Sequence, residues 1–304
     1  MISTDNLIKK RILITGANTL SGQRLINFFA LQNRYQVLAT SLNPEKLTDD
    51  AEYIHCDITS RDQFKKYAME FYPDVIINAE ELCNSDKYES EKEKAWKINV
   101  KAIEYITEVA RVLDSHVIHL SSIDVFGGSK GPYSEKAVPN PLTYYARTRL
   151  AAENVLKLSG TIYTLVRASQ IYGLDKINDD SFIKRIVKTS LTGEQVSCDN
   201  KVTLNPLFTD DLVQAVSKII EYKKQGIFHI GGKDFITMFE LAERIINVLN
   251  LKNTVIKPVL SNKEKTNSDN FDNSLVTIKA QTELRYEPHS MAEALLIIKK
   301  ELNK

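Results

Sequence analysis

The sequence predicts an α/β fold built on a parallel sheet. Through the first half of the 304-residue chain, short apolar runs alternate with longer amphipathic stretches. The apolar runs are nearly continuous, as in strands that are buried on both faces of a sheet. A turn with two glycines, Gly16 and Gly22, joins the first run to the first amphipathic stretch. This succession of strand, turn and helix is that of βαβ units.

The elements follow in order along the chain. Predicted strands cover residues 11–15, 35–41, 53–56, 75–79, 116–121 and 162–167. Between them, helices are predicted at 20–31, from the cap at 59–62 through 71, at 91–113 and at 142–158. After Gly173 the rhythm is less regular, with further helices at 181–191, 210–222, 237–250 and 290–302. Residues 260–274 are rich in Lys, Asn, Asp and Ser, which indicates an exposed loop.

Composition limits the classes of function. The chain has 40 Lys plus Arg against 39 Asp plus Glu, a net charge of +1, which argues against a nucleic-acid partner. Charged residues make up 26% and hydrophobic residues 43%, as in globular proteins. Cys56, Cys83 and Cys198 lack metal-ligand spacing and are expected to be buried thiols without a metal. With neither a signal peptide nor a membrane span in sight, we expect a cytoplasmic protein without a membrane partner.

The turn from Thr15 to Gly22 has the features of a phosphate-binding turn. Glycine allows a tight turn, backbone N–H groups can approach a pyrophosphate, and the helix N-terminus adds its dipole. Gly16 and Gly22 fill the first and last glycine places of a G-x-x-G-x-x-G pattern. Thr19 takes the middle place, where its Cβ would crowd the phosphates although its hydroxyl could donate to them. A strand-turn-helix connection without a ligand is the alternative at this point.

The end of the second strand bears on the choice between NAD and NADP. An acidic residue there binds the ribose hydroxyls of NAD, whereas a cation suits the 2′-phosphate of NADP. Residues 40–43, including Ser41, carry neither charge. The missing carboxylate favours NADP, with NAD still open. Asp57 and Ile58, which end the third strand, fit a contact with the adenine edge, and a plain helix cap is the alternative.

A tyrosine, a cation and a serine form a candidate catalytic set. Tyr145 and Arg149 are four residues apart on a predicted helix and therefore share a face. Ser121 and Ser122 end the preceding strand, where side chains reach the ligand crevice of a parallel sheet. A cation near a tyrosine lowers the tyrosine pKa from its reference of about 10 towards working pH. A surface pair on a helix is the default for this spacing taken alone.

Segments with a recognisable family pattern lie at 12–18, 73–79, 98–99, 119–126, 131–135, 139–142, 167–173 and 286–290. Through them, nearly the whole chain resembles the extended short-chain dehydrogenase/reductase family, and within it the dTDP-4-dehydrorhamnose reductase group. The segment 131–153 matches the reductase group rather than the wider family.

The resemblance implies a fold and a site. The fold would be a Rossmann-type doubly wound parallel sheet with a smaller C-terminal α/β substrate lobe. Residues 1–173, with return segments near 202–230, would bind NAD(P), and 174–304 would form most of the lobe. Tyr145 would donate a proton to the substrate carbonyl, Ser122 would hydrogen-bond that oxygen, and Asn99 would hold helix geometry and a water-linked proton path. The cofactor would be lined by Gly16, Asn18, Thr19, Leu20, Gly22, Ser41, Asp57, Ile58, Ala79, Glu80, Glu81, Ser121, Tyr145, Arg149, Ile171 and Tyr172.

Several residues depart from the family pattern. Arg149 stands where the family has a compact lysine, which predicts altered or weakened chemistry. Glu80 introduces a carboxylate where alanine is common, and it could repel phosphates. Ser122 replaces a threonine, and Ile123-Asp124 replace Asp-Tyr. Arginines that normally help to bind a nucleotide sugar are missing at 202–207 and at 266–267.

Three functions stay open on the sequence. The first is an NAD(P)-dependent reductase of a keto group on a nucleotide-activated deoxysugar, with the family default of dTDP-rhamnose biosynthesis. The second is a nucleotide-sugar epimerase or dehydratase, which Ile123 disfavours because dehydratases carry Asp-Glu after the hydroxyl residue. The third is a weakly active homologue that binds dinucleotide and regulates a partner. The oligomeric state is open, although members of the family often form homodimers.

Overall fold

A computed structural model shows that the chain divides into two compact units. The first comprises residues 1–121, 141–166 and 219–227, and the second comprises 122–140, 167–218 and 228–304. The structure describes residues 8–43, 50–80, 90–128, 130–174, 181–251, 254–259 and 271–303. Within these ranges no helix is both long and apolar enough to cross a membrane.

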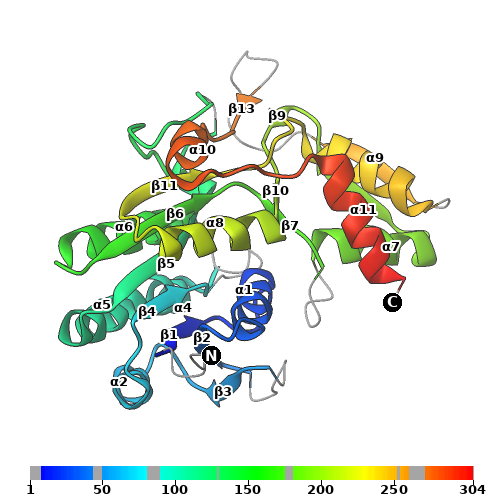
Figure 1. Ribbon diagram of the computed structural model, residues 1–304. Coiled ribbons are helices and arrows are strands. Elements are labelled where there is room, and N and C mark those ends of the chain that lie inside the picture. Colours follow the sequence, from blue (N-terminus) through cyan, green and yellow to red (C-terminus); the bar gives the residue numbers. More distant parts are fainter. Residues whose placement is uncertain are drawn as a thin grey trace. The chain divides into compact units, whose positions relative to one another are not determined.

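The described residues form a seven-stranded sheet, which confirms the predicted α/β fold (Figure 1). Its order is β11-β6-β5-β4-β1-β2-β3. The strands are β1 (Lys10–Thr15), β2 (Tyr35–Ser41), β3 (Glu52–His55), β4 (Val75–Asn78), β5 (His116–Ser122), β6 (Tyr163–Ala168) and β11 (Gly226–Ile230). β1 pairs in parallel with both β2 and β4, and β4 pairs in parallel with β5. The strand order therefore reverses between β1 and β4, the position at which open α/β sheets bind ligands.

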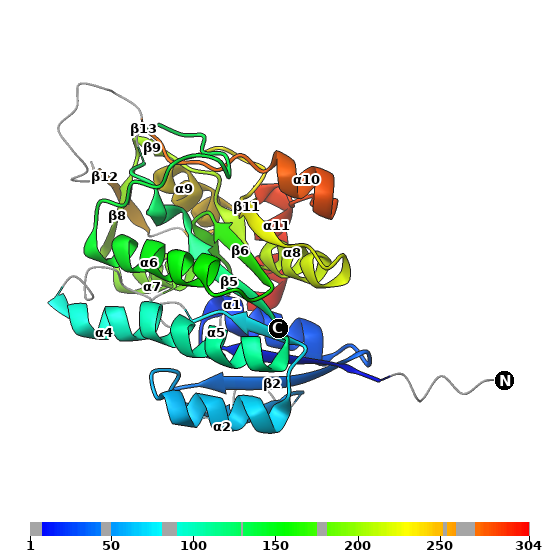
Figure 2. The same ribbon diagram turned by 90° about the vertical axis from the view of Figure 1, so that its left-hand side faces the viewer.

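The helices of the first unit cover both faces of the sheet. Leu13, Leu38, Ile76 and Val117 point to one face, where they form a core with α2 (Arg61–Phe71), α5 (Ala102–Leu113) and α6 (Tyr144–Leu158). α1 (Leu20–Ala30) buries Leu25, Ile26 and Phe29. Figure 2 shows α1 and α2 on opposite sides of β2. The sheet is thus covered on both faces, as the continuous apolar strands predict.

The predicted helix over 91–113 contains a turn of another kind. α4 (Lys92–Trp96) leads into a π-helical segment, η2 (Lys97–Lys101), and then into α5. A π turn cannot be recognised in the sequence, because the apolar spacing on either side of it still matches an α-helix. Single π turns within α-helices are frequent at functional sites, and this one carries Asn99.

The second unit has its own core. Apolar residues of α7 (Phe182–Thr192), α9 (Met238–Leu249) and α11 (Met291–Leu302) pack against β8 (Gln195–Asp199). β8 pairs in parallel with β12 (Val255–Val259). Two further helices are α8 (Thr209–Glu221) and α10 (Ile278–Leu284).

The predicted loop at 260–274 is wrong at its end. Phe271–Asp272 form β13, which pairs in parallel with β9 (Val202–Thr203). A two-residue strand has too few positions to show an alternating pattern in the sequence. Residues 260–270, which include the predicted departure at 266–267, lie outside the described residues.

The thiols are buried as predicted where they are described. Cys56 and Cys198 are free and buried. Burial, helped by the charge of Asp57, raises the pKa of the Cys56 thiol to about 12. Cys83 lies outside the described residues.

Candidate active site

Gly16 and Gly22 are required by the packing of the turn between β1 and α1. Gly16 has a φ of +72°, and a Cβ there would lie 2.6 Å from the carbonyl of Ala79 and from the amide of Glu80. A Cβ on Gly22 would lie 2.0 Å from the carbonyl oxygen of Gly16. The turn thus holds the N-terminus of α1 close to the carboxyl end of β4, which is the arrangement of a phosphate-binding turn.

Thr19 is part of this turn rather than an intruder in it. Its hydroxyl accepts from the amide of Gly22 at 2.9 Å, and its proton can reach the carbonyl oxygens of Gly16 at 2.9 Å and Ala79 at 3.1 Å. The side chain is buried and serves as the N-cap of α1. It is therefore committed to the backbone instead of to a phosphate. The amides of Leu20 and Ser21, in the first turn of the helix, have no acceptor within the helix.

Asn18 adds a polar atom to the turn. Its Oδ1 is buried and has no hydrogen-bond partner among the described residues. A buried acceptor of this kind requires a partner such as a ligand or an ordered water. The turn therefore offers helix amides without an acceptor in the helix, a buried side-chain oxygen without a partner, and glycines that have no room for a Cβ. These features together fit a dinucleotide at this turn.

A cavity of about 520 Å³ lies at the carboxyl ends of β2 and β3, in the same unit. Leu42 and Asp57 line one side of it, and residues 90–94, 97 and 98 line the other. Asp57 accepts from the amide and hydroxyl of Thr59 at 2.8 and 2.7 Å, so it holds the turn before α2, whose N-cap is Ser60. Ile58 is buried in the core, which leaves its backbone as the group available to an adenine.

The end of β2 shows why cofactor choice is hard to predict from that strand alone. The Ser41 hydroxyl is buried, 2.6 Å from the hydroxyl of Tyr53. Lysine side chains line the opposite wall of the cavity instead. There Lys94 pairs with Glu91 at 3.3 Å and Lys97 with Glu93 at 2.8 Å. These lysines lie about fifty residues beyond the strand, and only the fold brings them to it.

Glu80 is a partly buried carboxyl directly after β4 and Ala79. Its amide donates to Asn78 Oδ1 at 3.2 Å, and its backbone lies against Gly16. Burial, reinforced by the charge of Asp57, raises the pKa of Glu80 to about 7. The predicted unfavourable charge is therefore present, but near neutral pH it is titrating. Glu81 lies outside the described residues.

A buried polar ladder crosses the strands beneath this edge of the sheet. Thr15 Oγ1 donates to Asn78 Oδ1 at 2.8 Å, and Asn78 Nδ2 lies 3.1 Å from His119 Nδ1. Burial and the positive charge of Arg149, opposed by Glu153, lower the pKa of His119 to about 3. His119 is therefore neutral at pH 7 and serves as a core residue rather than a titrating base.

Tyr145 and Arg149 lie one turn apart on α6, as the spacing predicts. Both are buried, with exposed fractions of 5% and 3%. The Arg149 guanidinium donates to the carbonyl oxygen of Leu120, and at 3.5 Å to that of Glu80. Its Nε is buried and has no partner among the described residues. The cation thus bridges the ends of β4 and β5, which rules out the alternative of a surface pair.

Asn99 holds α6 at the position of Tyr145. Its Nδ2 donates to Thr148 Oγ1 at 2.7 Å, and that hydroxyl donates to the carbonyl oxygen of Tyr145 at 2.7 Å. Asn99 Oδ1 is buried and has no partner among the described residues, so it can accept from a water or a ligand group. The π turn at 97–101 thereby places a side chain that fixes the backbone of the candidate proton donor. Thr148 was not singled out from the sequence, and its signal is its place in the turn between Tyr145 and Arg149.

The serines at the end of β5 are engaged with carboxylates. Ser121 Oγ donates to Glu153 Oε1 at 2.8 Å, and Glu153 is fully buried and pairs with Lys157 at 3.2 Å. Ser122 Oγ donates to Asp124 Oδ2 at 2.8 Å and accepts from its amide at 3.1 Å. Ser122 and the predicted cofactor contacts Ile171 and Tyr172 belong to the second unit, so their approach to Tyr145 stays a prediction.

The first unit therefore brings together most of the predicted site. This unit contains the glycine turn, the cavity beside Asp57, Ala79, Glu80, Asn99, Tyr145 and Arg149. The arrangement offers orphan amides for phosphates, a cavity for a base, and a buried hydroxyl one helical turn from a buried cation. This set can bind an anionic cofactor and move a proton.

The chain is similar to known proteins over most of its length. The sequence model of the RmlD substrate binding domain family matches residues 10–303. A dTDP-4-dehydrorhamnose reductase of Aggregatibacter actinomycetemcomitans is 28% identical over 78% of this chain and 78% of its own. The methionine adenosyltransferase 2 subunit beta of Xenopus tropicalis is 25% identical over 82% of this chain and 75% of its own.

A solved structure shares the fold. The dTDP-4-dehydrorhamnose reductase of Bacillus anthracis, solved in complex with NADP, has a TM-score of 0.81 and 22% identity over 97% of this chain and 100% of its own. The family match spans both units and contains the phosphate-binding turn and the Tyr145–Arg149 pair. The chain belongs to the RmlD substrate binding domain family, in agreement with its resemblance to the dTDP-4-dehydrorhamnose reductase group.

Proposed function

We propose that the protein is an NAD(P)-dependent reductase of a keto group on a nucleotide-activated deoxysugar. The observation that carries this proposal is the buried pair of Tyr145 and Arg149 on α6, anchored by Asn99 in the unit that holds the phosphate-binding turn. The family supplies further support, because a relative bears the name dTDP-4-dehydrorhamnose reductase. The natural reaction would then be the last reduction of dTDP-rhamnose biosynthesis in the cytoplasm.

The chain's own residues would handle the proton and the charge. When bound, the nicotinamide would supply the hydride for the carbonyl carbon. Tyr145 gives its phenolic proton to the carbonyl oxygen, which completes the alcohol. The phenolate left on Tyr145 is stabilised by Arg149, one turn away and shielded from water. Asn99 keeps the tyrosine backbone in place, while its free Oδ1 can hold a water for reprotonation.

Ser122 would have to turn before it could serve the substrate. Its proton now goes to Asp124 Oδ2. A hydrogen bond from Ser122 to the developing oxyanion requires that contact to break, and Asp124 is free to accept from solvent instead. The cost of the exchange is that of one charge-assisted hydrogen bond, roughly 1.5–3 kcal/mol, which predicts slower turnover than a site with a free hydroxyl.

The cofactor is proposed to be NADP, with NAD as the second choice. Residues 41–43 carry no carboxylate to bind the ribose of NAD, and lysines reach the cavity beside Asp57. The Bacillus anthracis relative in complex with NADP points the same way. Titration of the purified protein with NADPH and NADH, followed by cofactor fluorescence, tests the preference directly.

Turnover tests the reaction itself. Purified protein is mixed with dTDP-4-dehydro-6-deoxy-mannose and NADPH or NADH, and cofactor absorbance is followed. The expected result is oxidation that disappears in Tyr145→Phe, which keeps cofactor binding because only the hydroxyl is lost. If neither cofactor is oxidised although one of them binds, the reductase proposal fails and a binding role remains.

That binding role is the second candidate, a regulatory homologue with weak or no activity. Two candidate catalytic groups favour it, because both already make hydrogen bonds within the protein. The Ser122 hydroxyl donates to Asp124, and the Arg149 guanidinium donates to the carbonyl oxygens of Leu120 and Glu80. Relatives named methionine adenosyltransferase 2 subunit beta are also similar over most of the chain. Arg149→Lys separates the candidates: a large gain in turnover indicates a site tuned away from catalysis, and a loss shows that Arg149 works in place of lysine.

A further inference from the structure

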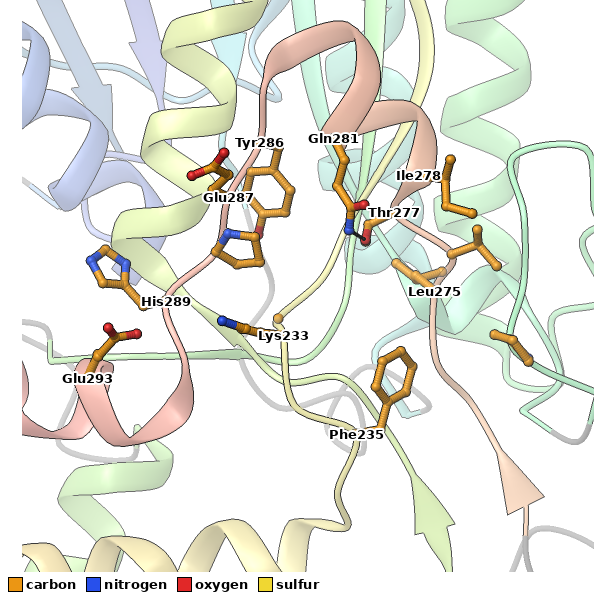
Figure 3. Close-up of a pocket in the computed structure, with 14 residues that line it drawn as sticks. Lys233, Phe235, Leu275, Thr277, Ile278, Gln281, Tyr286, Glu287, His289 and Glu293 are labelled. Atoms are coloured by element: carbon orange, nitrogen blue, oxygen red, sulfur yellow. Dashed lines mark hydrogen bonds between the residues drawn. The ribbon is translucent and has the colours of Figure 1, made fainter.

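The second unit contains a cavity of about 800 Å³ that the proposed reaction does not use (Figure 3). It lies between the loop after β11, residues 275–281 and residues 286–293. All of its lining residues belong to the second unit, and none is among the predicted cofactor or catalytic residues. Its volume is in the range of small-molecule sites, roughly 300–1,000 Å³.

One end of the cavity is apolar. Phe235 and Ile278 line it and expose 57% and 63% of their surface, which is high for large apolar side chains. Leu275 lies between them in Figure 3, on the side of the cavity away from His289. Apolar side chains gathered at a hollow gain free energy when a ligand covers them, so this end is suited to an apolar group.

The other end carries charges of both signs, and its Lys233 and Glu287 side chains are exposed. Among the described residues, neither the Lys233 ammonium nor the Glu287 carboxylate makes a hydrogen bond or an ion pair. Glu293 is engaged with Ser290, whose amide and hydroxyl donate to its Oε2 at 2.8 and 2.7 Å. These bonds lower the pKa of Glu293, and the positive charge of Lys233 adds to the effect. Figure 3 shows Lys233 extending towards His289 and Glu293, while Glu287 lies beside Tyr286.

His289 is fixed at the edge of this polar end. Its Nδ1 lies 2.5 Å from Asp211 Oδ1, and its amide donates to Asp211 Oδ2 at 3.1 Å. Asp211 is 1% exposed, so a buried carboxylate sets the orientation of the ring. The ring also meets Phe208 edge to face, with centroids 5.9 Å apart. Nδ1 is thus occupied, and Nε2 is the ring atom left for a ligand.

We infer that this cavity binds a free α-amino acid with an aromatic or branched apolar side chain. Lys233, beside His289, would receive its carboxylate, and Glu287 its ammonium group. The side chain would lie against Phe235 and Ile278. A purely anionic amphiphile would leave Glu287 facing a negative charge, and a purely cationic one would leave Lys233 facing a positive charge. Only a zwitterion pairs with both.

The test uses the full chain and probes that share one apolar group. L-Phenylalanine, 3-phenylpropionate and phenethylamine are titrated separately and followed by saturation-transfer NMR. L-Phenylalanine is expected to bind saturably and more tightly than either probe that lacks one of its charges. Lys233→Met and Glu287→Gln should each weaken L-phenylalanine about twofold to fivefold, the loss of one exposed ion pair.

Matched variants separate this result from general effects of charge. Lys300→Met and Glu243→Gln change exposed residues of α11 and α9 outside the lining and should leave binding unchanged. Lys233→Met should not weaken phenethylamine, because that probe has no carboxylate. Tyr145→Phe should bind L-phenylalanine normally, since the site does not depend on the proposed reaction. No saturable binding, or equal binding of the three probes, would overturn the inference, as would full affinity in both Lys233→Met and Glu287→Gln.

Discussion

Glu80 provides the sharpest test of the electrostatics at the phosphate-binding turn. Burial and the charge of Asp57 raise its pKa from 4.5 to about 7. Because the folded state holds the proton more tightly than the unfolded chain, the carboxyl stabilises the fold fully below the unfolded pKa. That contribution is lost as the pH rises through 7. The window therefore runs from about pH 4.5 to just above 7.

The size of the effect follows from the shift. A rise from 4.5 to about 7 corresponds to roughly 3 kcal/mol at most. Glu80 is only partly buried, and screening by solvent reduces this to about 1–2 kcal/mol. Glu80→Gln removes the titration. The variant should gain about 1–2 kcal/mol over the wild type on going from pH 5 to pH 8.5.

Urea denaturation of the cofactor-free protein at several pH values measures this difference. Glu70→Gln, an exposed change on α2, is the matched control and should follow the wild type. The same proton should govern cofactor binding, because a charged Glu80 repels phosphates. NADPH affinity is expected to fall between pH 6 and 8.5 in the wild type and much less in Glu80→Gln. Parallel stability curves and parallel affinities for the two proteins would refute the reasoning.

Other changes test the remaining contacts. Thr19→Ala removes the cap of α1 and should cost about 1 kcal/mol of stability in denaturation, while Thr19→Ser should cost much less. Gly22→Ala pushes a Cβ to 2.0 Å from a carbonyl oxygen and should cost more than about 2 kcal/mol and abolish NADPH binding by titration. Thr148→Val leaves the Asn99 amide unpaired and should lower kcat severalfold without changing the Kd for NADPH, whereas Thr148→Ser should restore it. Asp124→Ala frees the Ser122 hydroxyl and should raise kcat if Ser122 serves the substrate.

The parallel sheet and its helices could be predicted because each depends on local pattern. The continuous apolar strands, the caps and the spacing of Tyr145 and Arg149 are all features of neighbouring residues. The glycine turn between β1 and α1 was predictable for the same reason. The role of Thr19 could not be predicted, because its hydroxyl contacts the carbonyl oxygen of Ala79, sixty residues away.

The rest of the site depends on contacts that form only after folding. The π turn at 97–101 lies within an ordinary helical sequence pattern. Its role is seen only in the folded structure, where Asn99 bonds to Thr148 on α6. Lys94 of α4 and Lys97 of η2 line the cavity beside Asp57 only because the fold brings them to the residues that follow β3. Likewise, no spacing rule joins His289 to Asp211, which are 78 residues apart.

Two departures from the family pattern share one structural consequence. Thr19 donates to the carbonyl of Ala79, and Arg149 to those of Glu80 and Leu120. Both therefore satisfy carbonyls at the edge of the sheet where β4 and β5 end, next to the glycine turn. Arginine can span two strand ends because its guanidinium is a wide, planar fork, which a single ammonium cannot match. Arg149→Lys would accordingly loosen this edge while it restores a compact cation, so its turnover must be compared per folded molecule. A gain that survives this correction would show that the chain exchanged catalytic rate for a firmer cofactor turn.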